Sequence, residues 1–322
     1  MAGAIVITGG CGFLGAALAK RITQDGVTLP DGQHLTDPQI YLWDQPGAIA
    51  PDLPGVTCTA VDIADKAAVL QAMPDDVVLV YHLAAVVSGQ AEDDYDLGMR
   101  VNLEGTNAIL QAARAVRVGI PVIGTSSLAV YGGNPQEPLT EDTQIQPQNT
   151  YGVTKAMAEL VMADYRRRGW VDARTLRLQT ITVRPGLPNA AASSFASSII
   201  REPLGGVPAV CPVDPEMALW VASPDAAVTA LRHARSVPAD AWPAFGAVNM
   251  PGLRVQVLSM IASLRARAGD GTADLIEMKP DQRISDIVST WPTLFDTSLA
   301  QSLGFGGDAG FDAILDQAFL MK

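Results

Sequence analysis

The chain carries Thr8-Gly9-Gly10-Cys11-Gly12-Phe13-Leu14-Gly15 directly after the apolar run Ala4–Thr8 and at the start of a helical pattern over Phe13–Asp25. The spacing Gly9-x-x-Gly12-x-x-Gly15 lets the backbone turn sharply and approach a pyrophosphate, and the helix N-terminus adds partial positive charge. Glycines are common in turns, but a strand before them and a helix after them are typical of a dinucleotide-binding loop. The sequence therefore predicts that a dinucleotide binds at Gly9, Gly12, Phe13, Leu14 and Gly15.

Short apolar runs alternate with helical patterns through the first half of the chain. The apolar runs are hydrophobic nearly throughout, which indicates strands buried on both faces and therefore a parallel sheet. The expected strands are Ala4–Thr8, Gln39–Asp44, Val56–Asp62, Val77–Ala84, Val122–Ser126 and Thr175–Val183, and the expected helices are Phe13–Asp25, Lys66–Met73, Tyr95–Arg117 and Thr150–Arg168. This alternation predicts an α/β fold, a Rossmann doubly wound parallel sheet that binds ligands beyond the carboxyl ends of its strands.

The pattern changes after Arg184. Residues 185–224 are rich in Pro, Gly, Ala and Ser, and later elements are expected at Asp225–Ala234, Ala247–Met250, Val255–Ala268, Ser298–Leu303 and Phe311–Phe319. We expect residues 1–184, with 225–250, to form the NAD-binding Rossmann domain. Residues 185–224 and 251–322 are expected to form a smaller substrate-binding lobe. The insertion Val27–Pro38 contains Pro30-Asp31-Gly32 and predicts a surface loop.

Composition excludes several classes of protein. The 322 residues are 48% hydrophobic and 17% charged, which predicts a packed globule with a sizeable core. Because 22 Lys and Arg stand against 34 Asp and Glu, the net charge is −12, which disfavours nucleic-acid partners. The three cysteines and three histidines are scattered, without CxxC or zinc-ligand spacing, so we expect a reducing compartment and no metal. We find no signal-peptide pattern and no run of membrane-spanning length, so we expect a cytoplasmic protein without membrane contact.

An acidic residue ends the second expected strand. Asp44 at this strand tip can hydrogen-bond both ribose hydroxyls of an adenosine and would repel a 2′-phosphate. Gln45 and Pro46 follow it, with no Arg or Lys, which favours NAD over NADP as the cofactor. The alternative is that Asp44 only begins a turn. Further cofactor contacts are expected from residues that follow the third and fourth strands, namely Asp62, Ile63, Leu83, Ala84 and Ala85, whereas His82 is expected to be a packed histidine with satisfied hydrogen bonds.

Tyr151 and Lys155 stand four residues apart at the start of the expected helix Thr150–Arg168. Residues at this spacing share a helix face, so the phenol and the ammonium lie together. A free tyrosine has a pKa of about 10, and a nearby cation that stabilises the phenolate lowers it. The pair therefore predicts a tyrosine that takes the proton of a substrate alcohol while hydride leaves for a nicotinamide. The alternative is an ordinary solvated helix face.

The fifth strand ends in Gly124-Thr125-Ser126-Ser127-Leu128. A hydroxyl at a strand tip faces the ligand cleft and can bond the substrate oxygen. Ser127 is the expected residue and Ser126 the alternative. Either hydroxyl could instead cap the backbone of a turn.

These features together resemble an extended short-chain dehydrogenase/reductase of the NAD-dependent epimerase/dehydratase type. The resemblance rests on the glycine loop, Asp44, Ser126-Ser127-x-x-x-Tyr131-Gly132 and the Tyr151/Lys155 pair, and it extends to Phe295-Asp296 and Leu303-Gly304-Phe305. It implies that Ser127, Tyr151 and Lys155 are catalytic and bind substrate or NAD, and that Asn102, Leu178 and Thr180 lie along the cofactor. It also implies a homodimer through Tyr95–Arg117 and Thr150–Arg168. One departure is Thr180, which stands where many sugar-nucleotide relatives have the Asn of a Tyr-x-Asn sequence.

Three other stretches resemble a narrower branch, the D-erythronate dehydrogenases: Val86-Val87-Ser88-Gly89, Leu97–Asn102, and Arg184-Pro185-Gly186 leading to 189–195. This likeness implies oxidation of the C2 hydroxyl of a four-carbon sugar acid to a 2-oxo acid, with formation of NADH. Physical chemistry offers partial support, because Arg184 could hold the carboxylate and Ser88, Ser193 or Ser194 could supply hydroxyls. Alternatively, Ser193 or Ser194 caps a helix and Arg184 pairs with an acid.

Two rival functions stay open from the sequence. A sugar-nucleotide epimerase or dehydratase, or a dehydrogenase of another aldonate or uronate, could use the same scaffold. An epimerase would need cations for a diphosphate in the late lobe, but residues 203–215 contain no Arg or Lys. A regulator that senses NAD without chemistry would not need the complete set of Ser127, Tyr151 and Lys155.

Overall fold

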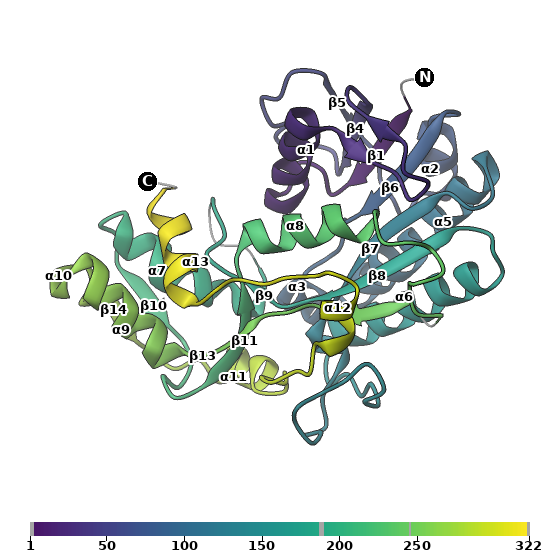
Figure 1. Ribbon diagram of the computed structural model, residues 1–322. Coiled ribbons are helices and arrows are strands. Elements are labelled where there is room, and N and C mark those ends of the chain that lie inside the picture. The colour runs from purple at the N-terminus through teal and green to yellow at the C-terminus, as the bar shows by residue number, and fades with distance from the viewer. Residues whose placement is uncertain (1–2, 187–189, 245, 321–322) are drawn as a thin grey trace.

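A parallel seven-stranded sheet forms the centre of the computed structural model, which describes residues 3–186, 190–244 and 246–320 (Figure 1). The strand order is β12-β8-β7-β6-β1-β4-β5, and all six pairings are parallel. The strands are β1 (Ala4–Thr8), β4 (Gln39–Asp44), β5 (Val56–Ala60), β6 (Val77–His82), β7 (Pro121–Ser127), β8 (Asp172–Leu178) and β12 (Ala247–Asn249). This architecture confirms the predicted Rossmann α/β fold.

Helices cover both faces of this sheet. On one face lie α2 (Lys66–Ala72), α5 (Gly105–Val116) and α6 (Thr150–Arg167), whose apolar residues share one core with the sheet. On the other face lie α1 (Phe13–Asp25), α8 (Pro224–Ala234) and α12 (Ser298–Ser302), which share a second core. The strands β1, β6 and β7 are buried nearly throughout, as expected of a sheet covered on both sides.

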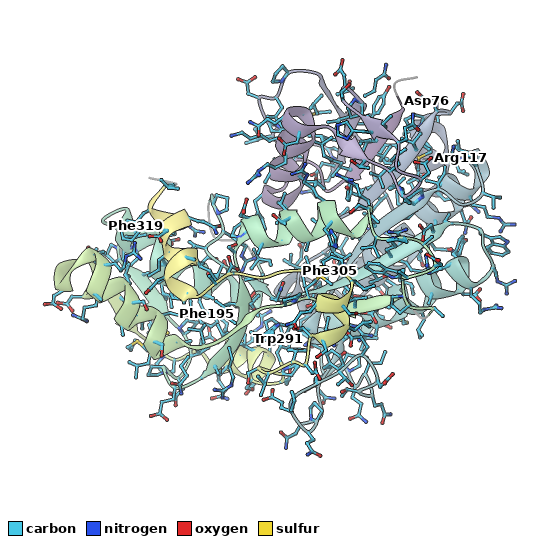
Figure 2. All side chains as sticks on the ribbon, in the orientation of Figure 1. Asp76, Arg117, Phe195, Trp291, Phe305 and Phe319 are labelled. Atoms are coloured by element: carbon cyan, nitrogen blue, oxygen red, sulfur yellow. The ribbon has the colours of Figure 1, made fainter. Side chains whose placement is uncertain are left out.

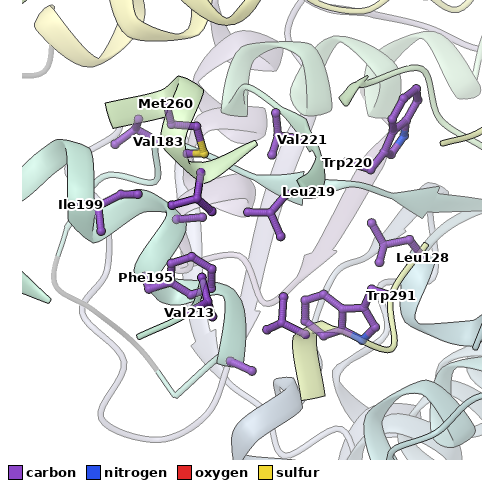
Figure 3. Packing of buried hydrophobic residues seen from close by; sticks show 14 of the residues in the cluster. Leu128, Val183, Phe195, Ile199, Val213, Leu219, Trp220, Val221, Met260 and Trp291 are labelled. Carbon is purple, nitrogen blue, oxygen red and sulfur yellow. The ribbon is translucent and has the colours of Figure 1, made fainter. Parts of the chain in front are cut away.

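The late part of the chain builds a separate core beside the carboxyl ends of these strands (Figures 1 and 3). A three-stranded sheet contains β13 (Leu253–Gln256), β11 (Ala218–Ala222) and β9 (Thr180–Ile181), and β10 (Ala209–Cys211) pairs with β14 (Ile276–Met278). Figure 3 shows Phe195, Ile199, Leu219 and Met260 packed together in this core. The surrounding helices are α7 (Phe195–Leu204), α9 (Val257–Ala268), α10 (Asp270–Ala273), α11 (Gln282–Val288) and α13 (Phe311–Phe319). The residue boundaries of the two predicted lobes stay a proposal.

Several local predictions were wrong. The run Thr175–Val183 is not one strand, because β8 ends at Leu178 and β9 joins the smaller sheet beside β11. The expected helix Tyr95–Arg117 is divided into α4 (Tyr95–Gly98), a π-helical turn (Met99–Glu104) and α5. Strand β5 was expected to be buried on both faces, but it is the edge strand and is largely exposed.

Other segments carry more structure than the sequence predicted. The insertion Val27–Pro38 is a small hairpin of β2 (Val27–Thr28) and β3 (His34–Leu35), and its Leu29 and Leu35 are buried in a core cluster. Within residues 185–224, the sequence predicted no range for a helix or strand because the segment is rich in Pro and Gly, but it contains α7, β10 and β11. The first residues of the expected helix Val255–Ala268 belong to β13 instead. In the part of the chain that the structure describes, we find no helix with the length and apolar character needed to span a membrane.

Candidate active site

The glycine loop joins β1 to α1 through positions that only glycine can occupy. Gly9 has a φ of +66°, and a Cβ there would lie 2.8 Å from the backbone nitrogen of Ala84. A Cβ on Gly15 would overlap the carbonyl oxygen of Gly9. Side chains at either position would push α1 away from the strands, so the predicted spacing has a direct steric reason.

The backbone N–H groups of this loop divide into two sets. Those of Gly10, Cys11 and Gly12 donate within the protein, to Trp43 O at 3.1 Å, Asp44 Oδ2 at 3.0 Å and Gly9 O at 3.1 Å. The first N–H groups of α1, from Phe13 to Gly15, have no intrahelical acceptor, and no side chain caps this end. The N-terminus of α1 therefore presents unused donors and positive dipole to the cleft, as phosphate binding requires.

Asp44 lies at the tip of β4 and contacts this loop. Its Oδ2 accepts from Cys11 N–H, and its Oδ1 accepts from the N–H of Gln45 at 2.9 Å. A carboxylate offers about four acceptor positions, so two stay available for ribose hydroxyls. A turn closed by Ala48 N–H and the carbonyl oxygen of Gln45 follows Asp44 directly, so fixing the start of this turn and binding a ribose are compatible roles for Asp44.

A cleft of about 510 Å³ runs along the carboxyl ends of the strands. The predicted cofactor residues that line it are Gly9, Gly12, Phe13, Leu14, Gly15, Asp44, Asp62, Ile63, Leu83, Ala84 and Ala85. Sequence reasoning missed Trp43, Gln90, Arg100 and Thr125, which also line it. His82 lies outside it and bonds Thr8 and Thr106 through its two ring nitrogens; because burial lowers its pKa to about 3, it is a neutral packed histidine, as expected.

A second cavity, of about 190 Å³, adjoins the cleft and shares six lining residues with it: Phe13, Leu14, Leu83, Ala85, Val87 and Thr125. The predicted residues that line this cavity are Ser88, Ser127, Tyr151, Lys155, Leu178, Thr180 and Arg184. Among the residues that sequence reasoning missed are Gln179 and Trp291, which no motif marks. Shared walls allow one elongated ligand to extend from the glycine loop to Tyr151, which fits a dinucleotide with its nicotinamide end in the second cavity.

The two chemical side chains of α6 are positioned by the start of that helix. Asn149 caps it by accepting from the N–H of Gly152 at 2.8 Å, which places Tyr151 in the first turn and Lys155 one turn later. Lys155 Nζ donates to the carbonyl oxygen of Thr125 at 2.9 Å and lies 5.9 Å from the centre of the Tyr151 ring. The loop after β7 is fixed by Ser127, whose Oγ accepts from the N–H of Ala129 at 3.1 Å. Ser127 therefore caps a turn and also lines the cavity.

The electrostatics of Tyr151 differ from the sequence prediction. Burial raises its pKa, and the opposing effects come from a hydrogen bond with Ser127 and from the charge of Arg184. Lys155 is itself buried, which lowers its pKa to about 8. The charge that lowers the pKa of Tyr151 is that of Arg184, whereas the Lys155 ammonium donates to the carbonyl oxygen of Thr125.

Arg184 lies in the second cavity at the end of the segment that follows β9. Its Nη2 donates to Ser193 Oγ at 3.4 Å, and its carbonyl oxygen accepts from Arg201 Nη1 at 2.6 Å. Burial and the nearby charge of Arg201 lower the pKa of Arg184 to about 10. Arg201 also pairs with Glu202 at 2.6 Å, which partly balances this second positive charge beside Arg184. The cavity is therefore suited to a small anion.

The remaining predicted residues are placed less directly. Asn102 lines neither cavity; it is buried and bonds the backbone of Val86 and the hydroxyl of Thr154, so it ties one wall of the cleft to α6. Ser194 also lines neither cavity, whereas Ser193 lines the second one. Ser88 is buried and accepts from the N–H of Ala192 at 3.0 Å. Asn189, part of the stretch after Arg184, lies outside the described residues.

Comparison with known proteins agrees with this geometry. Residues 5–209 match the model of the NAD dependent epimerase/dehydratase family. The chain belongs to that family. It is 47% identical to a D-erythronate dehydrogenase of Cupriavidus necator, over 97% of this chain and 96% of that one, and 40% identical to a D-erythronate dehydrogenase of Haemophilus influenzae, over 97% and 98%. A solved structure described as a nucleoside-diphosphate-sugar epimerase from Agrobacterium tumefaciens superposes with a TM-score of 0.86 at 36% identity, over 97% and 92% of the two chains.

Membership identifies an NAD-dependent oxidoreductase with a small-molecule substrate. The residues fit NAD: the N-terminus of α1 for its phosphates, Asp44 for a ribose, and the second cavity for its nicotinamide. No group of three or more His, Cys, Asp or Glu side chains that could hold a metal occurs among residues 3–186, 190–244 and 246–320.

Replacing Asp44 by alanine should lower the preference for NAD over NADP by about tenfold or more, because the carboxylate that repels a 2′-phosphate is lost. The measurement is kcat/KM with each cofactor. Asp52→Ala, which removes an exposed acid, is the matched control and should leave the ratio unchanged. An unchanged ratio in Asp44→Ala would remove Asp44 from cofactor selection.

Proposed function

We propose that this protein oxidises the C2 hydroxyl of D-erythronate, giving 2-oxo-erythronate and NADH, with Tyr151 as general base. The observation that carries the proposal is the convergence of Tyr151, Ser127 and the guanidinium of Arg184 on one small cavity beside the cofactor cleft. The same activity is printed in the names of two relatives that are similar over almost the entire chain.

The proton and the hydride leave the substrate in different directions. The C2 hydroxyl gives its proton to the Tyr151 oxygen, the C2–H electron pair leaves as hydride, and a carbonyl forms at C2. NAD, when bound, supplies the hydride acceptor. The Ser127 hydroxyl lies within hydrogen-bonding reach of Tyr151 and can orient the substrate oxygen. The pKa of Lys155 is about 8, so its amine is protonated at lower pH. The ammonium donates to the carbonyl oxygen of Thr125, a residue that lines both cavities.

The acid group of the substrate is assigned to Arg184. A guanidinium binds a carboxylate through two parallel N–H donors, and burial strengthens the attraction between them. Arg201 is paired with Glu202, yet its charge still lowers the pKa of Arg184, and no Asp or Glu is among the described residues that line the cavity. A carboxylate at this position would also neutralise the repulsion between the two arginines.

An epimerase acting on a nucleotide sugar is the second candidate, because a similar solved structure carries that description. The two activities differ in their products. An epimerase returns its hydride to the substrate, whereas a dehydrogenase accumulates NADH. Net NADH formation from free four- to six-carbon aldonates and uronates, compared with nucleotide sugars, therefore distinguishes them.

Three broader expectations stay proposals: a homodimer through the segments Tyr95–Arg117 and Thr150–Arg168, a role in carbohydrate metabolism, and a location in the cytoplasm. For the dimer, α6 presents Leu160 with 62% of its surface exposed on the side away from the sheet. An apolar side chain of this size on an exposed helix face is consistent with a protein interface.

Tyr151→Phe should lose at least about 100-fold in kcat on D-erythronate, which is the scale of general acid–base catalysis, and should keep NAD binding. Because Tyr151 must be deprotonated to act as base, wild-type kcat/KM should rise with pH towards its raised pKa, and this rise should vanish in the variant. Lys155→Met should also keep NAD binding and lose most turnover. Undiminished turnover in Tyr151→Phe would overturn the mechanism.

Arg184→Gln should raise the KM for D-erythronate by about 100-fold, the range expected when one partner of a buried charged pair is truncated. Wild-type protein should turn over the neutral four-carbon polyol poorly, and Arg184→Gln should reduce that residual rate far less than the rate on the acid, because only the effect of Arg184 on the pKa of Tyr151 is lost there. An equal loss on the acid and on the polyol would show that Arg184 acts on something other than the carboxylate.

A further inference from the structure

One wall of the cofactor cleft is a short helical segment rather than a strand end. This wall consists of α4 and the π-helical turn Met99–Glu104. Leu97, Arg100 and Val101 line the cleft from it. Arg100 and Val101 follow Leu97 by three and four residues, so the three side chains share one helical face, and that face lines the cleft. Arg100 thus points into the cleft together with two apolar residues that form the same wall.

Arg100 is the one cationic side chain among the described residues that line this cleft. The other ionisable side chains in the lining are Asp44 and Asp62, and the whole chain has a net charge of −12. The field around the cleft is therefore negative, which opposes the approach of an anionic dinucleotide. A local cation would offset this repulsion where the phosphates bind.

The backbone supplies donors for a pyrophosphate but no full charge. Three N–H groups of the glycine loop are already used within the protein, which leaves those at the start of α1. A helix N-terminus carries roughly half an elementary charge. A pyrophosphate carries two negative charges, so the loop alone leaves most of this charge unbalanced.

The guanidinium of Arg100 is free to take a ligand. It forms no ion pair or hydrogen bond with any residue among 3–186, 190–244 and 246–320, and the residue is exposed. By contrast, most other arginines near the active site are engaged, such as Arg177 with Glu159 and Arg201 with Glu202. Binding a phosphate through Arg100 would therefore break no existing pair.

We propose that Arg100 binds the pyrophosphate of NAD from the side of the cleft opposite the N-terminus of α1. The guanidinium supplies the full charge and the paired donors that the glycine loop lacks. The diphosphate is then held between a backbone dipole on one wall and a mobile cation on the other. This inference depends on NAD as the cofactor and not on the identity of the sugar acid.

The test measures ligand binding by isothermal titration calorimetry, without turnover. Arg100→Gln should weaken the binding of NAD and of ADP by about tenfold each. The binding of adenosine, which lacks phosphate, should weaken by less than about twofold. Arg100→Lys keeps the charge and should recover part of the lost affinity. Salt screens an exposed contact between charges. The difference in NAD affinity between wild type and Arg100→Gln should therefore shrink as salt rises from 0.05 to 0.5 M, where the Debye length falls to a few ångströms.

Arg117→Gln is the matched control. Arg117 is exposed and precedes β7, so it lies at the opposite end of the sheet from the cleft (Figure 2). The substitution changes the net charge by the same amount as Arg100→Gln, and the Arg117→Gln variant should bind NAD as the wild type does. Thermal melting of both variants without ligand should match the wild type and thereby exclude unfolding. Wild-type affinity of Arg100→Gln for NAD would overturn the proposal, and so would an equal loss for adenosine, which would place Arg100 on the adenine.

Discussion

The close packing of Gly15 against the backbone of Gly9 and Gly10 sets the position of everything else in the active site. It brings the N-terminus of α1 to the carboxyl ends of β1 and β4. Asp44 then fixes the loop by accepting from Cys11 N–H. As a result, the interior N–H groups of the loop are used by the protein, while the first N–H groups of α1 stay available for phosphate. The steric contact and the carboxylate together shape the cleft in which we expect a dinucleotide to bind, with its nicotinamide end in the adjoining cavity that Tyr151 lines.

The substrate side depends on how the chain leaves the central sheet. After Leu178, β9 joins the smaller sheet beside β11, and the chain then delivers Arg184 to the cavity that Ser127 and Tyr151 line. The hydroxyls of Ser127 and Tyr151 thus come from the Rossmann sheet and its α6 helix, and Arg184 comes from the chain that leads into the second core. In the proposed reaction, a substrate that spans both parts places its hydroxyl at Tyr151 and its acid group at Arg184. The proposed preference for a small hydroxy acid depends on this arrangement.

The sequence predicted the parts of the molecule that local patterns determine. The limits of β1, β4, α1 and α13 agree with the expected ranges, because each is bounded by glycine or by a clear change of periodicity. The glycine loop, Asp44, Tyr151 and Lys155 were likewise found from motifs with fixed spacing. The π-helical turn at Met99–Glu104 was missed, since one extra residue in a helical turn leaves little trace in apolar periodicity.

Tertiary packing explains the other differences. The division of β8 from β9 depends on pairing with β11, about 40 residues later, which no local pattern reveals. Trp291 reaches the second cavity from a segment far along the chain, and Arg100 resembled any other helix arginine until its neighbours were placed. Tyr151 and Lys155 line the same cavity, as their spacing predicted, but the charge that lowers the pKa of the phenol comes from Arg184, which no helix periodicity connects to Tyr151.

In the proposed reaction, hydride leaves C2 of a sugar acid while Tyr151 deprotonates the C2 hydroxyl. The decisive experiment uses D-erythronate that carries deuterium at C2 and follows both the rate and the label. We expect each NADH formed to carry that deuterium and kcat/KM to be lower than with unlabelled acid. NADH without deuterium, or transfer of a label placed at C3 instead, would contradict it.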